Sequence, residues 1–146
     1  YKSYLSIMLL ESFLYALLLF LLLGNMSLYL MDISVEDIKF NIILSLGAGI
    51  YEELIFRVFS IFIFYRFISF IFKSMRHFST QFFALLLSSI LFSLFHFMGT
   101  ESFSQEAFTI RFIAGILLGI LYINRGFGIT AITHSFYDIF VIFQLT

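Results

Sequence analysis

Long apolar segments follow one another along the chain, separated by short polar connectors. A helix crosses the hydrocarbon core of a bilayer with about 20 mainly apolar residues. The chain is 62% hydrophobic and 12% charged, whereas soluble domains carry roughly 25% charged residues. The sequence therefore predicts an all-α membrane protein, a bundle of about five transmembrane helices in a single membrane domain over residues 1–146. The predicted spans are residues 4–31, 40–72, 81–98, 107–123 and 127–145.

The second apolar segment, residues 40–72, is too long for one span perpendicular to the membrane. It is either a tilted helix or two segments broken at Gly47–Gly49. Glycine weakens a helix and lets another backbone come close, and these glycines directly precede a cluster of charges. Gly115 and Gly119 have the small-residue spacing that permits close helix packing.

Positive charges fall at alternate ends of the predicted spans, and the connectors 32–37 and 100–106 between them are acidic. Because positive charges favour the cytoplasmic side, we expect the first residues to lie inside. The net charge of −1 gives no basic field for nucleic acid, so we expect membrane lipids, and not nucleic acid, as partners. The positive residues at these alternate ends are Lys2, Arg66, Lys73, Arg76 and Arg125.

Glu52, Glu53 and Arg57 place three charges inside an apolar segment. A charge at membrane depth costs about 2.5–3.5 kcal/mol on insertion scales, so the cluster needs partners, a water-filled cavity or a function. Glu53 and Arg57 are one helical turn apart and can pair, which predicts structural support from these two. Glu52 points about 100° away from Glu53 and has no local partner. A buried carboxylate of this kind keeps a proton more readily than one in water, which suits a general base.

Two histidines lie in later apolar segments. His96 is near the end of its span and, taken alone, is most simply an interfacial residue. His134 is deeper in the last span, one turn before Asp138, whose carboxylate can accept a hydrogen bond from the imidazole and fix its tautomer. In a membrane such a pair is either a buried polar link between helices or part of a functional site.

Glu52, His96 and the His134–Asp138 pair come from three separate helices, and in one polar cavity they would be able to activate water. In one chemistry, Glu52 and His96 are general base and general acid, and the pair orients the substrate carbonyl or stabilises the oxyanion. In the other, His96, His134 and a carboxylate bind Zn²⁺. No His-Glu-x-x-His motif supports zinc, and we expect no cofactor. Serine chemistry is disfavoured because no nucleophile elbow surrounds Ser60, Ser93 or Ser135.

Two further charges stand within the spans. Glu11 is expected at the membrane interface or at a helix contact. Arg111 either pairs with Glu106 near the outer face, which we favour, or reaches the cavity. Asn124 and Arg125 are most simply a connector.

Three motifs in order, Glu-Glu-x-x-x-Arg, Phe-x-x-x-His and His-x-x-x-Asn/Asp, resemble those of the CAAX protease and bacteriocin-processing (abortive infection) family. Its members are intramembrane endopeptidases of the type II CAAX prenyl protease class and their prokaryotic relatives. In this chain the motifs read Glu52-Glu53…Arg57, Phe92…His96 and His134…Asp138.

The resemblance implies an all-helical fold with a conical cavity, and a family core over about residues 40–146. Glu52 and His96 match the family's water-activating pair, and His134 and Asp138 match the positions assigned to oxyanion stabilisation, where many members carry Asn. A carboxylate donates a hydrogen bond only when protonated, so we favour an orienting role toward His134 for Asp138. We favour the mechanism without a metal; a zinc-dependent enzyme would use His96 and His134.

The same resemblance implies a peptide or protein substrate and a multi-pass protein in the plasma membrane of a prokaryote. The alternative function is a non-catalytic membrane scaffold or a bacteriocin self-immunity protein of the same family. A proton-coupled transporter is a third hypothesis, which the lack of an internal repeat disfavours. Because one span precedes the first motif, we expect a minimal or a truncated family member.

The five-span arrangement separates the predicted site residues along the membrane normal. His96 would lie near the outer face, His134 about 10 Å from the inner face at 1.5 Å per residue, and Glu52 between them. Convergence therefore requires tilted helices, a re-entrant break near Gly47–Gly49, or different span limits.

Overall fold

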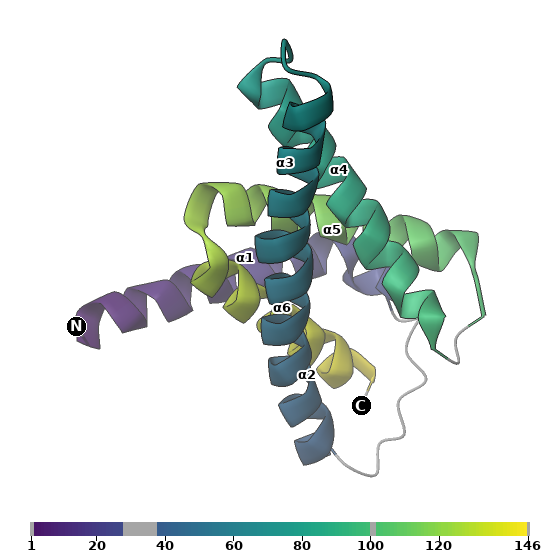
Figure 1. The fold of residues 1–146 in the computed structure, drawn as a ribbon. Coiled ribbons are helices and arrows are strands. Elements are labelled where there is room, and N and C mark those ends of the chain that lie inside the picture. The colour runs from purple at the N-terminus through teal and green to yellow at the C-terminus, as the bar shows by residue number, and fades with distance from the viewer. Residues whose placement is uncertain (1, 28–37, 100–101, 146) are drawn as a thin grey trace.

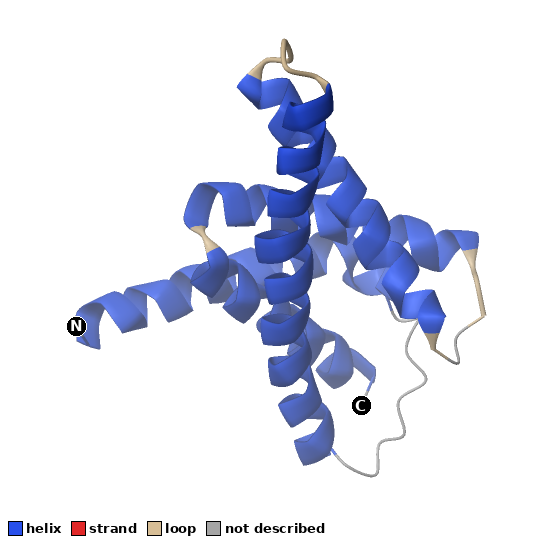
Figure 2. Cartoon of the chain, in the orientation of Figure 1, coloured by secondary structure: helices blue, strands red, loops and turns tan. Residues whose placement is uncertain are grey.

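The computed structural model describes residues 2–27, 38–99 and 102–145, and its regular elements are all helical (Figures 1 and 2). The predicted acidic connector 32–37, with its topological role, lies outside the described residues, as do residues 100 and 101. No strand occurs in the described part of the chain. The elements are α1 (Lys2–Ser27), α2 (Ile38–Glu53), the π-helix η3 (Leu54–Ser60), α3 (Ile61–Ile71), α4 (His77–Phe95), the 3₁₀-helix η4 (His96–Met98), α5 (Gln105–Arg125) and α6 (Phe127–Leu145).

Four of the described helices are long and apolar enough to cross a membrane, which makes this an integral multi-pass membrane protein. They are Ser3–Gly24, Phe40–Ile71, His77–Met98 and Gln105–Arg125, and Phe127–Phe143 is a shorter apolar helix. The exposed surface is rich in large apolar side chains, while many serines and threonines and the charged residues Glu53 and Arg57 are buried. That distribution suits a lipid surrounding and confirms the predicted all-α membrane class.

The long second segment is one continuous helix, not two. It runs through α2, η3 and α3 without a break at Gly47–Gly49 (Figure 1). Its apolar part, Phe40–Ile71, has 32 residues and is about 48 Å long at 1.5 Å per residue. Since the hydrocarbon core is only about 30 Å thick, such a helix fits by tilting. Of the two alternatives for this segment, the structure therefore has the unbroken helix and not the two segments.

Gly49 allows α2 and α6 to come together next to the charged cluster. A Cβ atom on Gly49 would lie 2.8 Å from the backbone nitrogen of Ser135 and 3.0 Å from the carbonyl oxygen of Ala131. By contrast, a Cβ on Gly47 would meet nothing within 4 Å. The predicted close approach of another backbone thus occurs at the second of the two glycines.

The Gly115 and Gly119 pair lies in the contact between α5 and α4. A Cβ on Gly115 would be 3.1 Å from Cβ of Ser89, and one on Gly119 would strike the side chain of Leu85. Leu85 also belongs to a buried apolar cluster that joins α3 and α4. Its other members are Ile61, Ile68 and Ala84.

The first helix crosses the molecule and packs against α6 (Figure 1). Two polar contacts tie them together: Ser12 Oγ donates to the Ile129 carbonyl at 3.3 Å, and Thr133 Oγ1 donates to the Ser12 carbonyl at 3.4 Å. Glu11 accepts two hydrogen bonds from Arg125 at 2.5 and 2.6 Å. Glu11 therefore makes the predicted helix contact, and Arg125 also links the end of α5 to α1.

Candidate active site

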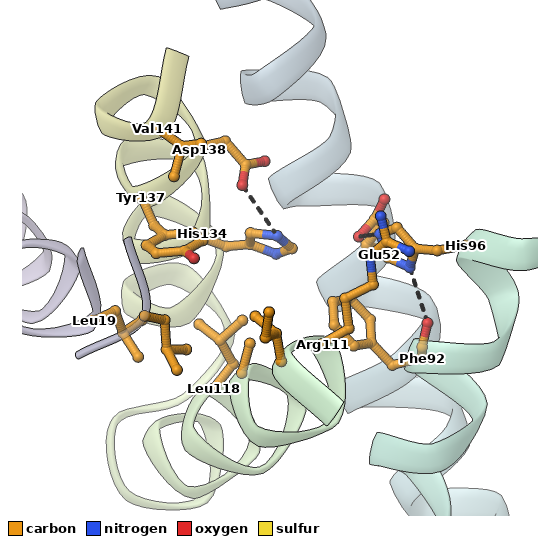
Figure 3. Close-up of a pocket in the computed structure, with 13 residues that line it drawn as sticks. Leu19, Glu52, Phe92, His96, Arg111, Leu118, His134, Tyr137, Asp138 and Val141 are labelled. Carbon is orange, nitrogen blue, oxygen red and sulfur yellow. Dashed lines mark hydrogen bonds and ion pairs between the residues drawn. The ribbon is translucent and has the colours of Figure 1, made fainter. Parts of the chain in front are cut away.

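The four side chains predicted to carry chemistry line one cavity of about 180 Å³ (Figure 3). Glu52 comes from the end of α2, His96 from the turn that follows α4, and His134 and Asp138 from α6. Apolar side chains of α1, α5 and α6 form much of the remaining wall, among them Leu19, Leu118 and Val141.

Glu52 and His96 face each other across a short gap. The distance from Glu52 Oε2 to His96 Nε2 is 3.8 Å. This is longer than a hydrogen bond and short enough for both atoms to contact the same water molecule. The other ring nitrogen, Nδ1, donates to the Phe92 carbonyl oxygen at 3.0 Å. Because a carbonyl only accepts, Nδ1 carries a hydrogen, and Nε2 is the ring nitrogen that faces Glu52 and can accept a proton.

Glu53 and Arg57 form the predicted ion pair, with Arg57 Nε 3.0 Å from Glu53 Oε2. Both side chains are completely buried, at 0% and 1% exposure. The Arg57 guanidinium carbon lies 4.5 Å from the centre of the Phe92 ring, a cation–π contact. Among the described residues, the terminal nitrogens of Arg57 have no hydrogen-bond partner. The charge of Arg57 is therefore balanced by Glu53.

His134 lies between two carboxylates. Its Nδ1 donates to Glu53 Oε1 at 2.9 Å, and its Nε2 is 3.7 Å from Asp138 Oδ1. The contact with Glu53 holds the ring plane, so that Nε2 points toward Asp138 and the cavity (Figure 3). Carboxylates at both nitrogens complement an imidazolium, which has two N–H donors. Glu53 therefore supports the site from two sides, through Arg57 and through His134.

The link between Glu53 and His134 was not foreseen from the sequence. The two residues are 81 positions apart, so spacing along a helix gives no information about them. The one available signal is indirect: Gly49, a turn before Glu53, marks the place where another helix comes close, and Ser135 is the residue that it meets.

The structure brings these residues together although the predicted spans separated them along the membrane normal. The continuous second helix places Glu52 alongside α6, and His96, in η4 directly after α4, lines the same cavity. No re-entrant break occurs near Gly47–Gly49.

Two polar residues of the cavity wall were not among the predicted site residues. Arg111 lines the cavity, as in the less favoured of its two interpretations, and its guanidinium carbon is 5.2 Å from the centre of the Phe97 ring. Tyr137, which follows His134 by three positions on α6, lines the cavity as well (Figure 3). Neither residue has a motif around it that would have marked it as part of a site.

The donor set gives no ready metal site in the described residues. No group of three or more histidine, aspartate or glutamate side chains there is arranged to hold a metal ion. The prediction of no cofactor, with zinc at His96 and His134 as its alternative, stays a prediction.

Fold and site together define a helical multi-pass membrane protein with carboxylates and histidines gathered in an intramembrane cavity. Residues 34–140 match the model of the family described as type II CAAX prenyl endopeptidase Rce1-like, and the chain belongs to this family. The match contains all three motifs and confirms the resemblance found in the sequence. No curated protein and no solved structure matched the chain. Family membership establishes a CAAX-type protease fold.

Proposed function

We propose that the protein is an intramembrane endopeptidase that hydrolyses a peptide bond with water activated by Glu52 and His96. The observation that carries the proposal is the approach of these two side chains to 3.8 Å on the wall of a shared cavity. They come from different helices, and their polar atoms can contact one water between them. A general base and a general acid must lie within hydrogen-bonding reach of the group they serve, directly or through one water.

The proposed reaction starts with Glu52 as carboxylate and His96 as neutral imidazole with its hydrogen on Nδ1. The water oxygen forms a bond to the peptide carbonyl carbon, and one water proton goes to Glu52. Glu52 passes this proton to His96 Nε2, and His96 gives it to the amide nitrogen as the C–N bond breaks. A carboxylic acid and an amine are released, and both side chains return to the starting state. Each step uses the atom that faces the cavity, Oε2 or Nε2.

The oxyanion of the tetrahedral intermediate would be stabilised by His134. Its Nε2–H points toward the cavity, because Nδ1 is engaged by Glu53. A donor fixed in advance stabilises developing negative charge without having to reorganise. Asp138 orients this ring and supports its protonated form, and no catalytic metal is required in this scheme.

The proposed substrate is a peptide or protein segment that enters the membrane, and the proposed location is the plasma membrane of a prokaryote. The family description names prenylated CAAX substrates, so a test panel should contain prenylated and unprenylated C-terminal peptides. A non-catalytic scaffold or immunity function is the alternative, and it predicts protection or complex formation that survives Glu52→Gln.

The proposal is tested with purified protein in detergent and a pool of such peptides, with cleavage read by mass spectrometry. Glu52→Gln and His96→Ala should each abolish cleavage, a loss of at least about 10²-fold for a general acid–base group, while both variants insert and fold. Glu106→Gln is the matched control, because Glu106 is exposed at the start of α5 and does not line the cavity. Full cleavage by either site variant would refute the assignment.

A further inference from the structure

The proposed site is built on a stretch of unusual helix. Directly after Glu53 the chain forms the seven-residue π-helix η3, in which backbone hydrogen bonds reach the fifth residue instead of the fourth. Such segments are rare and occur frequently at functional sites. The buried residues of η3 are Phe56, Arg57 and Ser60. Whatever fixes η3 therefore also fixes the position from which Arg57 reaches Glu53.

Ser88 of α4 holds the middle of this segment. Its hydroxyl donates a hydrogen bond to the carbonyl oxygen of Phe56. Ser88 is 1% exposed and Phe56 is 2% exposed. If the Ser88 hydroxyl is removed, water therefore has little access to replace it as a donor to the Phe56 carbonyl, and buried backbone carbonyls need a partner. Within η3, Ser60 Oγ donates to the Ile55 carbonyl at 2.9 Å. Two serine hydroxyls thus satisfy backbone oxygens of the π-helix, but only Ser88 ties it to another element.

A continuous series of contacts leads from η3 to the cavity. Arg57 Nε lies 3.0 Å from Glu53 Oε2. Glu53 Oε1 accepts from His134 Nδ1 at 2.9 Å, and the opposite ring nitrogen faces Asp138. Because Arg57, Glu53 and His134 are all buried, solvent has little room to absorb a shift of Arg57. Such a shift would therefore pass to Glu53 and then to the His134 ring.

We propose that Ser88 is a positioning residue, which holds the Phe56 carbonyl so that the π-helix directs Arg57 and Glu53 onto His134. The effect on catalysis rests on the proposed function, whereas the effect on the His134 ring does not. Ser88 does not line the cavity, and it acts through the helix backbone.

Ser89 offers a matched control one residue away. It is also 1% exposed, but its hydroxyl donates to the Leu85 carbonyl of its own helix at 2.9 Å. Replacing either serine by alanine removes one hydroxyl group from an equally buried position of α4. Only the Ser88 variant takes a hydrogen bond away from η3.

The test is a ¹⁵N spectrum of the full chain labelled at histidine, in detergent micelles, together with cleavage kinetics. The chain has three histidines, and His77, whose ring lies 5.4 Å from that of Tyr65, is an internal reference away from the cavity. In Ser88→Ala the ring signals of His134 should move while those of His77 stay. Ser89→Ala should leave both in place. The kcat of Ser88→Ala should fall roughly tenfold with KM unchanged, since small misplacements of reacting groups are costly.

Unchanged His134 signals in Ser88→Ala, or an equal movement in Ser89→Ala, would overturn the proposal. If the wild-type protein cleaves no peptide, the proposed function fails and the spectra still decide the role of Ser88. If Ser88→Ala does not fold, Ser88→Cys and Ser89→Cys take its place, because a thiol is similar in shape and only a weak donor. A His134 shift confined to Ser88→Cys then supports the proposal, and no shift refutes it.

Discussion

Glu53 and His134 are 81 positions apart in the chain and meet in the protein interior, with Oε1 2.9 Å from Nδ1. The second carboxylate oxygen of Glu53 faces Arg57. One buried carboxylate therefore joins a cation of its own helix to the ring of a histidine on another. Glu52, its neighbour in sequence, faces His96 and the cavity instead. The two adjacent glutamates have separate partners and, in our proposal, separate tasks.

Arg57→Ala should lower the stability of the protein. The substitution leaves the fully buried Glu53 without its cation, and removal of one partner from a buried ion pair costs about 3–5 kcal/mol. We expect a clear decrease in the midpoint of thermal unfolding in detergent and a lower yield of inserted protein. Arg66→Ala is the control, because Arg66 is an exposed arginine of α3. Equal unfolding midpoints for Arg57→Ala and wild type would contradict the supporting role.

Substitutions of Asp138 should separate an orienting role from an ionic one. The Asp138 carboxylate is 3.7 Å from His134 Nε2, and an asparagine oxygen can accept from the same N–H. Asp138→Asn should therefore keep most of the cleavage activity. Asp138→Ala removes the acceptor, and kcat/KM should fall about tenfold or more, as for other losses of support around an oxyanion site. Cleavage rates of wild type and the two variants on one peptide give the answer. An equal loss in both variants would mean that the charge of Asp138 is needed, and wild-type rates in both would argue against any role for this side chain.

Local contacts were predictable from the sequence and long-range ones were not. The spacing of Glu53 and Arg57 allows one geometry if the segment is helical, so their ion pair followed directly. The apolar segments likewise indicated membrane helices, because only helices and closed barrels satisfy the backbone in lipid and barrel strands alternate apolar with polar residues. The contact of Glu53 with His134 depends instead on how two helices cross. Gly49 shows that another helix can come close near Glu53, but it does not tell which helix that is.

The π-helix η3 likewise could not be predicted from the residues that form it. Residues 54–60 read as ordinary apolar helix with one arginine, and no glycine or proline marks the widened turns. Ser88, which bonds the Phe56 carbonyl, is 32 positions away. The resemblance of the three motifs to a known family supplied what periodicity could not, namely the expectation that Glu52, His96 and His134 lie together. The roles of these residues in catalysis stay predictions.

Gly49→Ala should disrupt the packing that brings α2 onto α6. The added methyl group would lie 2.8 Å from the Ser135 backbone nitrogen, and excess volume in a packed interior costs typically about 1–3 kcal/mol. Gly47→Ala is a sensitive control, since its methyl group would meet nothing within 4 Å and alanine favours a helix over glycine by about 1 kcal/mol. Thermal unfolding should therefore show a lower midpoint for Gly49→Ala and an equal or higher one for Gly47→Ala. The opposite order would mean that the two helices do not meet at Gly49.

Metal removal should leave cleavage unchanged. In the proposed mechanism the proton acceptor and donor are Glu52 and His96 themselves, and water needs no Lewis acid to reach the carbonyl. Zinc sites in hydrolases use three protein ligands and a water, and no three such side chains are arranged in this way among the described residues. We expect equal rates before and after treatment with 1,10-phenanthroline, with a zinc protease inhibited in parallel as the control, and substoichiometric metal in the purified protein. A loss of activity that Zn²⁺ restores would reverse this conclusion and make His96 and His134 the first ligands to test by substitution.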